Sequence, residues 1–132
     1  KDDHPDKPQM TVSEIFDHSS NIGTVKIAEK IGIENQKEFL GKIGFLKKID
    51  AEFPGLGRPI YPRNWSQISL FTISYGHGIA ITPLHLATAV SAIVNGGILH
   101  NPSFLKLDNY TKTKKYVFRL MSENIKSIFV YK

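Results

Sequence analysis

Residues 10–32 read MTVSEIFDHSSNIGTVKIAEKIG and predict two helices separated by a short polar break. Thr11 followed three residues later by Glu14 is the pattern of a capping box, which starts a helix. The second helix is predicted from an apolar face with the spacing i, i+3, i+4, i+7, and Gly32 is expected to end it. The members of that face are Thr24, Ile27, Ala28 and Ile31. Residues 18–21 (HSSN) form the break, which places small polar side chains and free main-chain amides at a helix start.

Residues 33–63 predict one helix followed by an irregular connector. The helix is expected to open with the capping pattern of residues 35–38 (NQKE) and to end at Gly44. Its buried side is expected to consist of Phe39, Leu40 and Ile43. Residues 53–63 (FPGLGRPIYPR) hold three prolines and two glycines, so we expect no regular structure there.

Residues 64–97 predict two more helices on either side of a glycine-rich turn. Residues 64–67 (NWSQ) resemble a cap and lead a short helix up to Phe71, and residues 74–78 (SYGHG) allow a tight backbone path. Thr82 followed by Pro83 is a strong helix start. This last helix is expected to stop at Gly96 and Gly97, to use His85 as a hydrogen-bonding residue, and to present one apolar face of Leu86, Val90, Ile93 and Val94.

The remaining residues change character. Residues 104–107 and 116–120 are apolar and bracket a lysine-rich turn, which predicts a hairpin, and residues 122–124 (SEN) are expected to cap a final helix. The predicted fold class is therefore mainly α with a small β-hairpin. We divide the chain into a helical part, residues 1–102, and a basic part with the hairpin and the last helix, residues 103–132.

The net charge of the 132-residue chain is +5, from 17 Lys plus Arg against 12 Asp plus Glu. Residues 1–102 carry ten basic and ten acidic side chains, so the whole excess lies in residues 103–132. Because the body of the domain is neutral and aromatic residues do not alternate with the basic ones, we expect no nucleic-acid binding. The chain has no cysteine, which excludes disulfides and thiolate zinc sites, and its five histidines lack metal-ligand spacing. No metal and no cofactor are expected.

One set of motifs has chemical meaning, the S-x-x-K, S-x-N and K-T-G signature of active-site serine acyl-transfer enzymes. S-x-x-K occurs once, at residues 103–106, in the predicted hairpin, where a strand would point Ser103 and Lys106 to opposite faces. Residues 112–114 (KTK) lack the glycine of K-T-G, and residues 122–124 are interpreted as a cap. Residues 19–21 (SSN) lie at a helix start, where the simpler interpretation is that a serine only caps the helix.

Two stretches carry a family resemblance: residues 10–32, quoted above, and residues 64–102, NWSQISLFTISYGHGIAITPLHLATAVSAIVNGGILHNP. Together they resemble class B penicillin-binding proteins, the peptidoglycan D,D-transpeptidases, most of all the cell-division (septal) type. The resemblance covers roughly residues 3–107. It implies the serine transpeptidase (β-lactamase-like) α/β fold, of which this chain would be the helical subdomain with most of the central sheet missing.

The resemblance also implies roles for five residues. Ser19 would relay a proton between the catalytic lysine and the leaving group, and Asn21 would contact that lysine and the acyl amide of a stem peptide or β-lactam. Ser20 occupies the variable position of the motif, counted with the substrate-binding residues. Tyr75 and His77 match positions that line the substrate cleft, although the family often has tyrosine at the second. The alternative for His77 is an exposed turn histidine.

The family's S-x-x-K nucleophile and K-T-G strand are not among these residues, so the chain is interpreted as a piece of a longer protein. That parent is expected to cross-link stem peptides in septal wall synthesis, to bind penicillin, and to work with divisome membrane proteins at the periplasmic face of the bacterial inner membrane. The isolated chain is predicted to be catalytically inactive. Whether the apolar side that would face the missing sheet drives self-association stays open from the sequence.

A different class of function stays open from the residues alone. The chain could be a non-enzymatic helical interaction module whose basic end, residues 103–132, docks on an acidic partner or a membrane surface. Such binding would depend on salt and would disappear when the basic end is removed.

Overall fold

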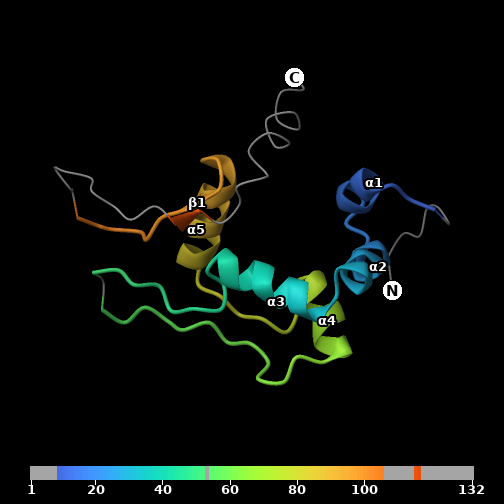
Figure 1. Cartoon of the computed structure of the whole chain (residues 1–132), viewed down its shortest axis with the longest axis horizontal. Helices are drawn as coiled ribbons and strands as arrows, with labels where there is room; N and C mark the ends of the chain where they lie inside the picture. The colour runs from blue at the N-terminus through green and yellow to red at the C-terminus, as the bar shows by residue number, and fades with distance from the viewer. Residues whose placement is uncertain (1–8, 53, 106–114, 117–132) are drawn as a thin grey trace. The chain divides into compact units, whose positions relative to one another are not determined.

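The computed structural model describes residues 9–52, 54–105 and 115–116, and this part of the chain is mainly helical (Figure 1). Its helices and strands, in chain order, are α1 (Val12–Asp17), α2 (Asn21–Ile31), α3 (Ile33–Lys42), α4 (Gln67–Ser74), α5 (Pro83–Val94), β1 (Ile98–Leu99) and β2 (Lys115–Tyr116). In this part of the chain, no helix has the length and apolar character needed to cross a bilayer.

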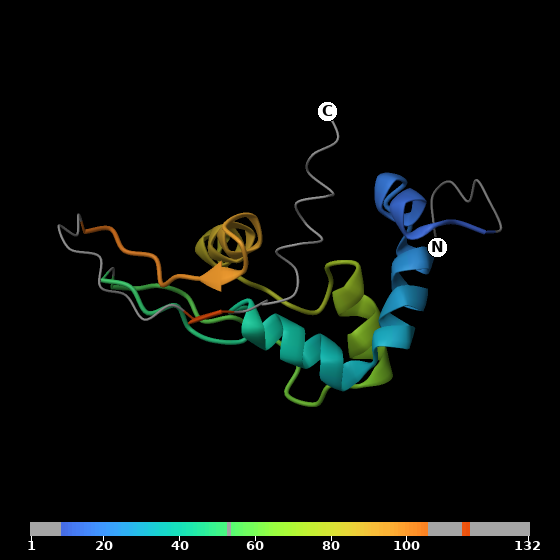
Figure 2. The ribbon, with the colours of Figure 1, turned by 45° about the horizontal axis from the view of Figure 1, so that its top comes forward.

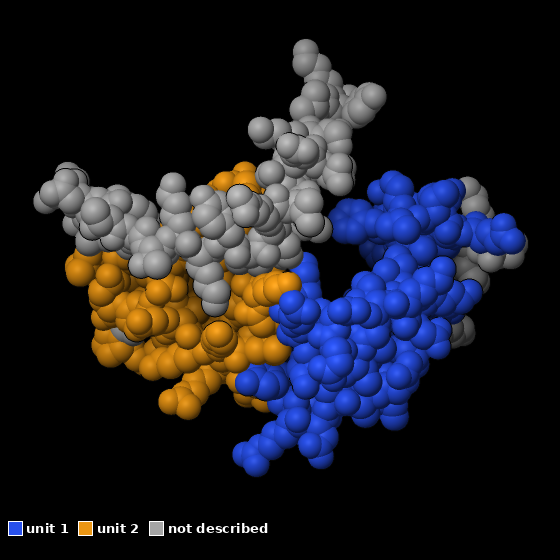
Figure 3. Space-filling model, in the orientation of Figure 1, with its two compact units in different colours: residues 1–39, 61–80 blue, residues 40–60, 81–132 orange. Residues whose placement is uncertain are grey.

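The chain forms two compact units, coloured separately in Figure 3. Unit 1 consists of Lys1–Phe39 and Tyr61–Ala80, and unit 2 of Leu40–Ile60 and Ile81–Lys132. Unit 1 therefore contains α1, α2 and α4, and unit 2 contains α5 and the strand pair.

The start of α1 is the predicted capping box. The Glu14 N–H donates to the Thr11 hydroxyl at 3.3 Å, and the Thr11 N–H donates to the Glu14 carboxylate at 2.8 Å. In α2 the predicted face is largely correct, since Ala28 is buried and Thr24 and Ile27 are half-buried. Ile31, the last residue of the helix, is 46% exposed, so its predicted burial is wrong.

Helix α3 begins two residues earlier than predicted, at Ile33. Asn35 lies inside the helix, where its side-chain amide donates to the carbonyl of Ile31, so it is not the cap. Of the predicted buried side, Ile43 is buried and Leu40 half-buried, whereas Phe39 is exposed. The capping pattern of the sequence was misleading here because Gly32 already ends α2 and lets the next helix follow directly.

Helix α4 is capped by Ser66, whose hydroxyl accepts the Ser69 N–H, and it runs three residues beyond the predicted end at Phe71. It packs on α2 within unit 1. Gln36, in α3, makes two hydrogen bonds to the same segment: its side chain accepts from the Trp65 indole at 3.0 Å and donates to the Leu70 carbonyl at 3.0 Å. The start of α4 therefore lies beside the residues that follow the end of α2.

Helix α5 starts at Thr82 and Pro83 as predicted, but it buries a different face. The buried residues of this helix are His85, Ala89 and Ala92. Three members of the predicted face are instead exposed, namely Leu86 at 53%, Val90 at 49% and Val94 at 66%, and Ile93 is half-buried. The small alanines allow a close approach, and Ala89 joins a core cluster with Ile43, Leu40, Phe45 and Leu99.

His85 is the polar centre of unit 2, and its predicted hydrogen bonding is confirmed. It is 2% exposed. The Thr82 N–H donates to Nδ1, which places the ring proton on Nε2, and Nε2 donates to the Lys47 carbonyl at 2.9 Å. The imidazole thus completes a capping box at the start of α5 and ties that helix to a loop 38 residues earlier.

The strand pair differs from the predicted hairpin in one of its two partners. β1 and β2 pair antiparallel, with Ile98 opposite Tyr116 and Leu99 opposite Lys115. Phe104 and Leu105, predicted as the first strand, are exposed and lie outside it. Residues 106–107 and 117–120, and the predicted last helix after residue 121, lie outside the described residues.

The two bonds of His85 predict a clear stability difference between two variants of the chain. His85→Ala is expected to lower the free energy of unfolding by about 2–3 kcal/mol, because it opens a cavity and removes the donor for the Lys47 carbonyl. His85→Gln is expected to lose less, since glutamine can complete the same capping box. Urea unfolding followed by circular dichroism measures both, and equal losses would contradict this account.

Candidate functional site

The S-x-N segment, residues 19–21, is built by the end of α1 and the start of α2, which share one tight corner. The Ser19 N–H donates to the Phe16 carbonyl at 3.1 Å, and the Ser20 N–H donates to the Ile15 carbonyl at 3.0 Å. These two bonds form a Schellman motif, in which the residue after the helix cap adopts a left-handed conformation. That residue is Ser19, with φ 50°, and it is the only non-glycine residue with positive φ in the described part of the chain.

Ser20 lies at the inside of this corner and is 4% exposed. Its hydroxyl accepts the Gly23 N–H at 3.0 Å, which makes it the N-cap of α2. Its carbonyl accepts both the main-chain N–H and the hydroxyl of Thr24. The capping interpretation of the sequence is therefore confirmed for Ser20, while its contact with substrate stays a prediction.

Ser19 and Asn21 flank the buried serine and are both exposed. Within the described residues, neither the hydroxyl of Ser19 nor the side-chain amide of Asn21 makes a hydrogen bond. Both side chains therefore offer their polar groups to solvent or to a bound molecule, at the positive end of the α2 dipole.

Tyr75 and His77 lie in the turn that follows α4. Tyr75 is the C-cap of that helix, and the His77 N–H donates to the Thr72 carbonyl at 2.9 Å. Their rings meet edge to face, with centroids 5.5 Å apart and an angle of 76° between the planes. Gly76 and Gly78 have φ of 94° and 82°, so the turn needs glycine at both positions. Both rings are exposed.

These two segments lie at the same end of the packed α2–α4 pair. The start of α4 lies beside the end of α2, and the two helices run side by side in opposite directions (Figure 2). The start of α2, with Ser19 and Asn21, is thus at the same end as the end of α4, with Tyr75 and His77. Unit 1 contains all five residues that the sequence singled out.

Unit 2 holds a separate pocket of about 480 Å³ that the sequence did not predict. Its lining includes Lys47, Lys48, Asp50 and His100. The buried polar side chain there is His85, and both of its ring nitrogens already have partners. Nothing in this pocket points to a ligand.

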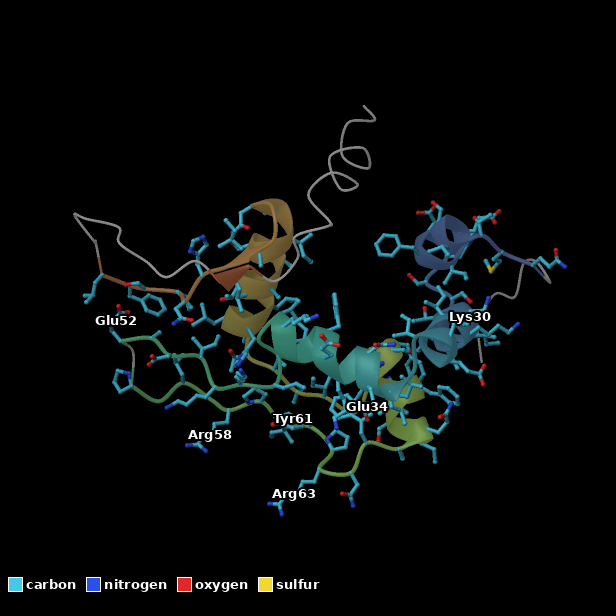
Figure 4. All side chains as sticks on the ribbon, viewed as in Figure 1. Lys30, Glu34, Glu52, Arg58, Tyr61 and Arg63 are labelled. Carbon is cyan, nitrogen blue, oxygen red and sulfur yellow. The ribbon has the colours of Figure 1, made fainter. Side chains whose placement is uncertain are left out.

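The S-x-x-K match at residues 103–106 gains no support from the described residues. The Ser103 hydroxyl donates to the carboxylate of Glu52 at 2.6 Å, and Glu52 is labelled in Figure 4. Lys106 lies outside the described residues. In the described part of the chain, no lysine forms a hydrogen bond with Ser19 or Asn21, and no group of three metal-binding side chains occurs.

Comparison with known proteins gives a consistent picture. Residues 1–128 match the family described as "Penicillin binding protein transpeptidase domain". The chain is 38% identical over 106 residues to the probable peptidoglycan D,D-transpeptidase FtsI of Caulobacter vibrioides, covering 80% of this chain and 18% of that protein. It is 33% identical over 101 residues to the probable peptidoglycan D,D-transpeptidase PenA of Neisseria meningitidis serogroup B, covering 75% and 17%. The chain thus spans less than a fifth of either relative.

A solved structure supports the same similarity. The transpeptidase domain of penicillin-binding protein 3 from Burkholderia pseudomallei superposes with a TM-score of 0.76 at 29% identity. The match covers 90% of this chain and 37% of that one. The mainly helical fold described above is therefore part of a serine transpeptidase fold, as the resemblance implied.

The left-handed conformation of Ser19 predicts that glycine stabilises this position. Ser19→Gly is expected to raise the free energy of unfolding of the chain by about 1 kcal/mol, because glycine adopts positive φ without a steric cost. The neighbouring Ser20→Ala is the matched control and is expected to lower it by about 1 kcal/mol through loss of the N-cap. The midpoint of urea unfolding measures both changes, provided that the slope of the transition is the same in the variants and the wild type. A destabilised Ser19→Gly variant would show that the corner is not strained.

Proposed function

Because the chain belongs to the penicillin-binding protein transpeptidase family, we propose that it forms part of a serine D,D-transpeptidase that cross-links peptidoglycan stem peptides. The observation that carries this proposal is the corner at residues 19–21. Ser19 is held in an unfavourable backbone conformation, and its exposed hydroxyl makes no hydrogen bond within the described residues, while Ser20 does the capping. Strain of this kind is typical of functional sites.

The proposed reaction is acyl transfer through a serine ester. A nucleophilic serine and its lysine base come from a part of the protein beyond this chain. The serine oxygen attacks the carbonyl carbon, the carbon–nitrogen bond breaks, and the serine proton passes to the lysine. We propose that the Ser19 hydroxyl hands that proton on to the leaving amine, and that Asn21 holds the lysine and the acyl amide. The amine of a second stem peptide then attacks the ester carbonyl, the carbon–oxygen bond to the serine breaks, and the serine oxygen takes up the proton of that amine.

Tyr75 and His77 are proposed to line the substrate end of the same site. The support is their exposure and their place at the Ser19 end of the helix pair. His77 would then present an imidazole to the substrate, beside the Tyr75 ring, at a position where the family often has tyrosine. Ser20 is proposed to affect substrate binding only indirectly, because its hydrogen bonds hold the main chain on either side of it in place.

We further propose that the parent acts in septal wall synthesis, with divisome membrane proteins, at the periplasmic face of the inner membrane, and that it binds β-lactams. The similarity to a protein named FtsI supports the septal assignment. The alternative, an interaction module with a basic end, stays a prediction because most of residues 103–132 lie outside the described part.

We propose that the isolated chain self-associates, with a second copy of the chain packing on one apolar face of α5. Leu86, Val90 and Val94 recur at intervals of four residues, so they form one stripe, and all three are about half exposed or more. Covering this stripe would remove apolar surface from water.

A fluorescent penicillin tests the assigned roles. The 132-residue chain is expected to stay unlabelled after denaturing electrophoresis, because it lacks nucleophile and base. In the full encoded protein, meaning the longer transpeptidase of which this chain is proposed to be a part, Ser19→Ala is expected to slow labelling by roughly 100-fold or more. The reason is that proton transfer by a positioned group contributes about 10²–10⁴-fold to a rate. Ser91→Ala, at an exposed serine of α5, is the control and should label like the wild type. A labelled band at the mass of the isolated chain would contradict the assignment.

Sedimentation tests the α5 stripe. The isolated chain is expected to form dimers or larger species at micromolar concentration, and Val90→Lys should shift it to the monomer because a charge then sits within the stripe. Ser91→Lys places the same charge on another side of the helix and should leave the association unchanged. A wild-type chain that sediments as a monomer would remove the basis of this proposal.

A further inference from the structure

One glycine in the first turn of α2 is required by space. A Cβ built on Gly23 would lie 2.6, 2.8 and 2.9 Å from the three outer carbons of the Ile15 side chain. Real Cβ atoms do not approach carbon so closely, so Ile15 and the helix that carries it would have to shift. Gly23 is helical, so positive φ does not explain the glycine, and glycine is otherwise disfavoured within helices.

Ile15 is also the residue whose carbonyl accepts the Ser20 N–H at 3.0 Å. The Ser20 hydroxyl in turn accepts the Gly23 N–H. Ile15, Ser20 and Gly23 therefore form a closed triangle of one steric contact and two hydrogen bonds. Ser19 has no side-chain partner of its own in the described residues, so the main chain that this triangle holds sets where the side chain leaves the corner.

We infer that Ile15 and Gly23 are positioning residues that hold the Ser19 hydroxyl and the Asn21 amide in their working geometry. The inference rests on the proposed function. A methyl group at position 23 would push α1 away from α2, and the Ile15 and Phe16 carbonyls, which hold the main chain of the corner, would move with it. A misplacement of about 1 Å at a reacting group can slow chemistry by roughly 10²-fold.

The chain offers a matched control for the steric effect. Gly41 is also a helical glycine, in α3, but a Cβ there would meet only the Leu46 side chain, at 4.0 Å. Gly41→Ala therefore makes the same chemical change without the collision. The double variant Gly23→Ala with Ile15→Ala removes all three colliding carbons and should relieve the clash.

The test has two readouts. In the full encoded protein, Gly23→Ala is expected to slow labelling by fluorescent penicillin at least tenfold, Gly41→Ala to leave it unchanged, and the double variant to label within about threefold of Ile15→Ala alone. In the 132-residue chain, the amide ¹H–¹⁵N resonances of Ser19 and Ser20 are expected to shift in Gly23→Ala and to return toward their original positions in the double variant.

The outcomes separate the two proposals. A full-length protein that takes no label overturns the proposed function, and the amide resonances then decide on the positioning role by themselves. Normal labelling and unshifted Ser19 and Ser20 amides in Gly23→Ala overturn the positioning role. If Gly23→Ala alone does not fold, the double variant decides: recovery relative to Ile15→Ala supports the role, and no recovery overturns it.

Discussion

The hydrogen bonds of Ser20 are the interaction on which the rest of unit 1 depends. Its N–H ends α1 on the Ile15 carbonyl, and its hydroxyl begins α2 on the Gly23 N–H. One residue therefore terminates one helix and starts the next, which leaves only His18, the C-cap of α1, and Ser19 between the end of α1 and the N-cap of α2. Such a short connection forces Ser19 into the left-handed region and turns its side chain outward.

Burial and hydrogen bonding set Ser19 apart from the two buried polar side chains of the described residues. Ser20 and His85 are buried, and each has its hydrogen-bonding atoms paired, so the free energy of their desolvation is offset by the helices they cap. Ser19 is the opposite case, because its backbone is unfavourable and its hydroxyl stabilises nothing in the described residues. Glycine would adopt the same backbone conformation without a steric cost.

Features of the fold that depend on local interactions could be predicted from the sequence, and features that depend on long-range packing could not. Capping signals are local, and they correctly located the starts of α1, α2 and α5, whereas α4 is capped by Ser66, two residues after the start of the predicted pattern. The buried face of α5 was predicted wrongly because Leu86, Val90 and Val94 have the correct periodicity but only tertiary packing selects a face. The strand partner of Tyr116 was missed for the same reason, since pairing with Ile98 is a long-range choice.

For the candidate site too, the residues could be predicted from the sequence, but their arrangement in space could not. The residues at 19–21 and the turn with Tyr75 and His77 could be singled out from their motifs and the family resemblance, yet their location at the same end of the helix pair follows from the packing of α4 on α2. The collision between Gly23 and Ile15 has no sequence signal at all, because an i, i+8 contact between two helices exists only once the corner has formed. The place of Ser19 at the left-handed residue of the corner therefore depends on the packing of α1 on α2 as well as on the three letters of the motif.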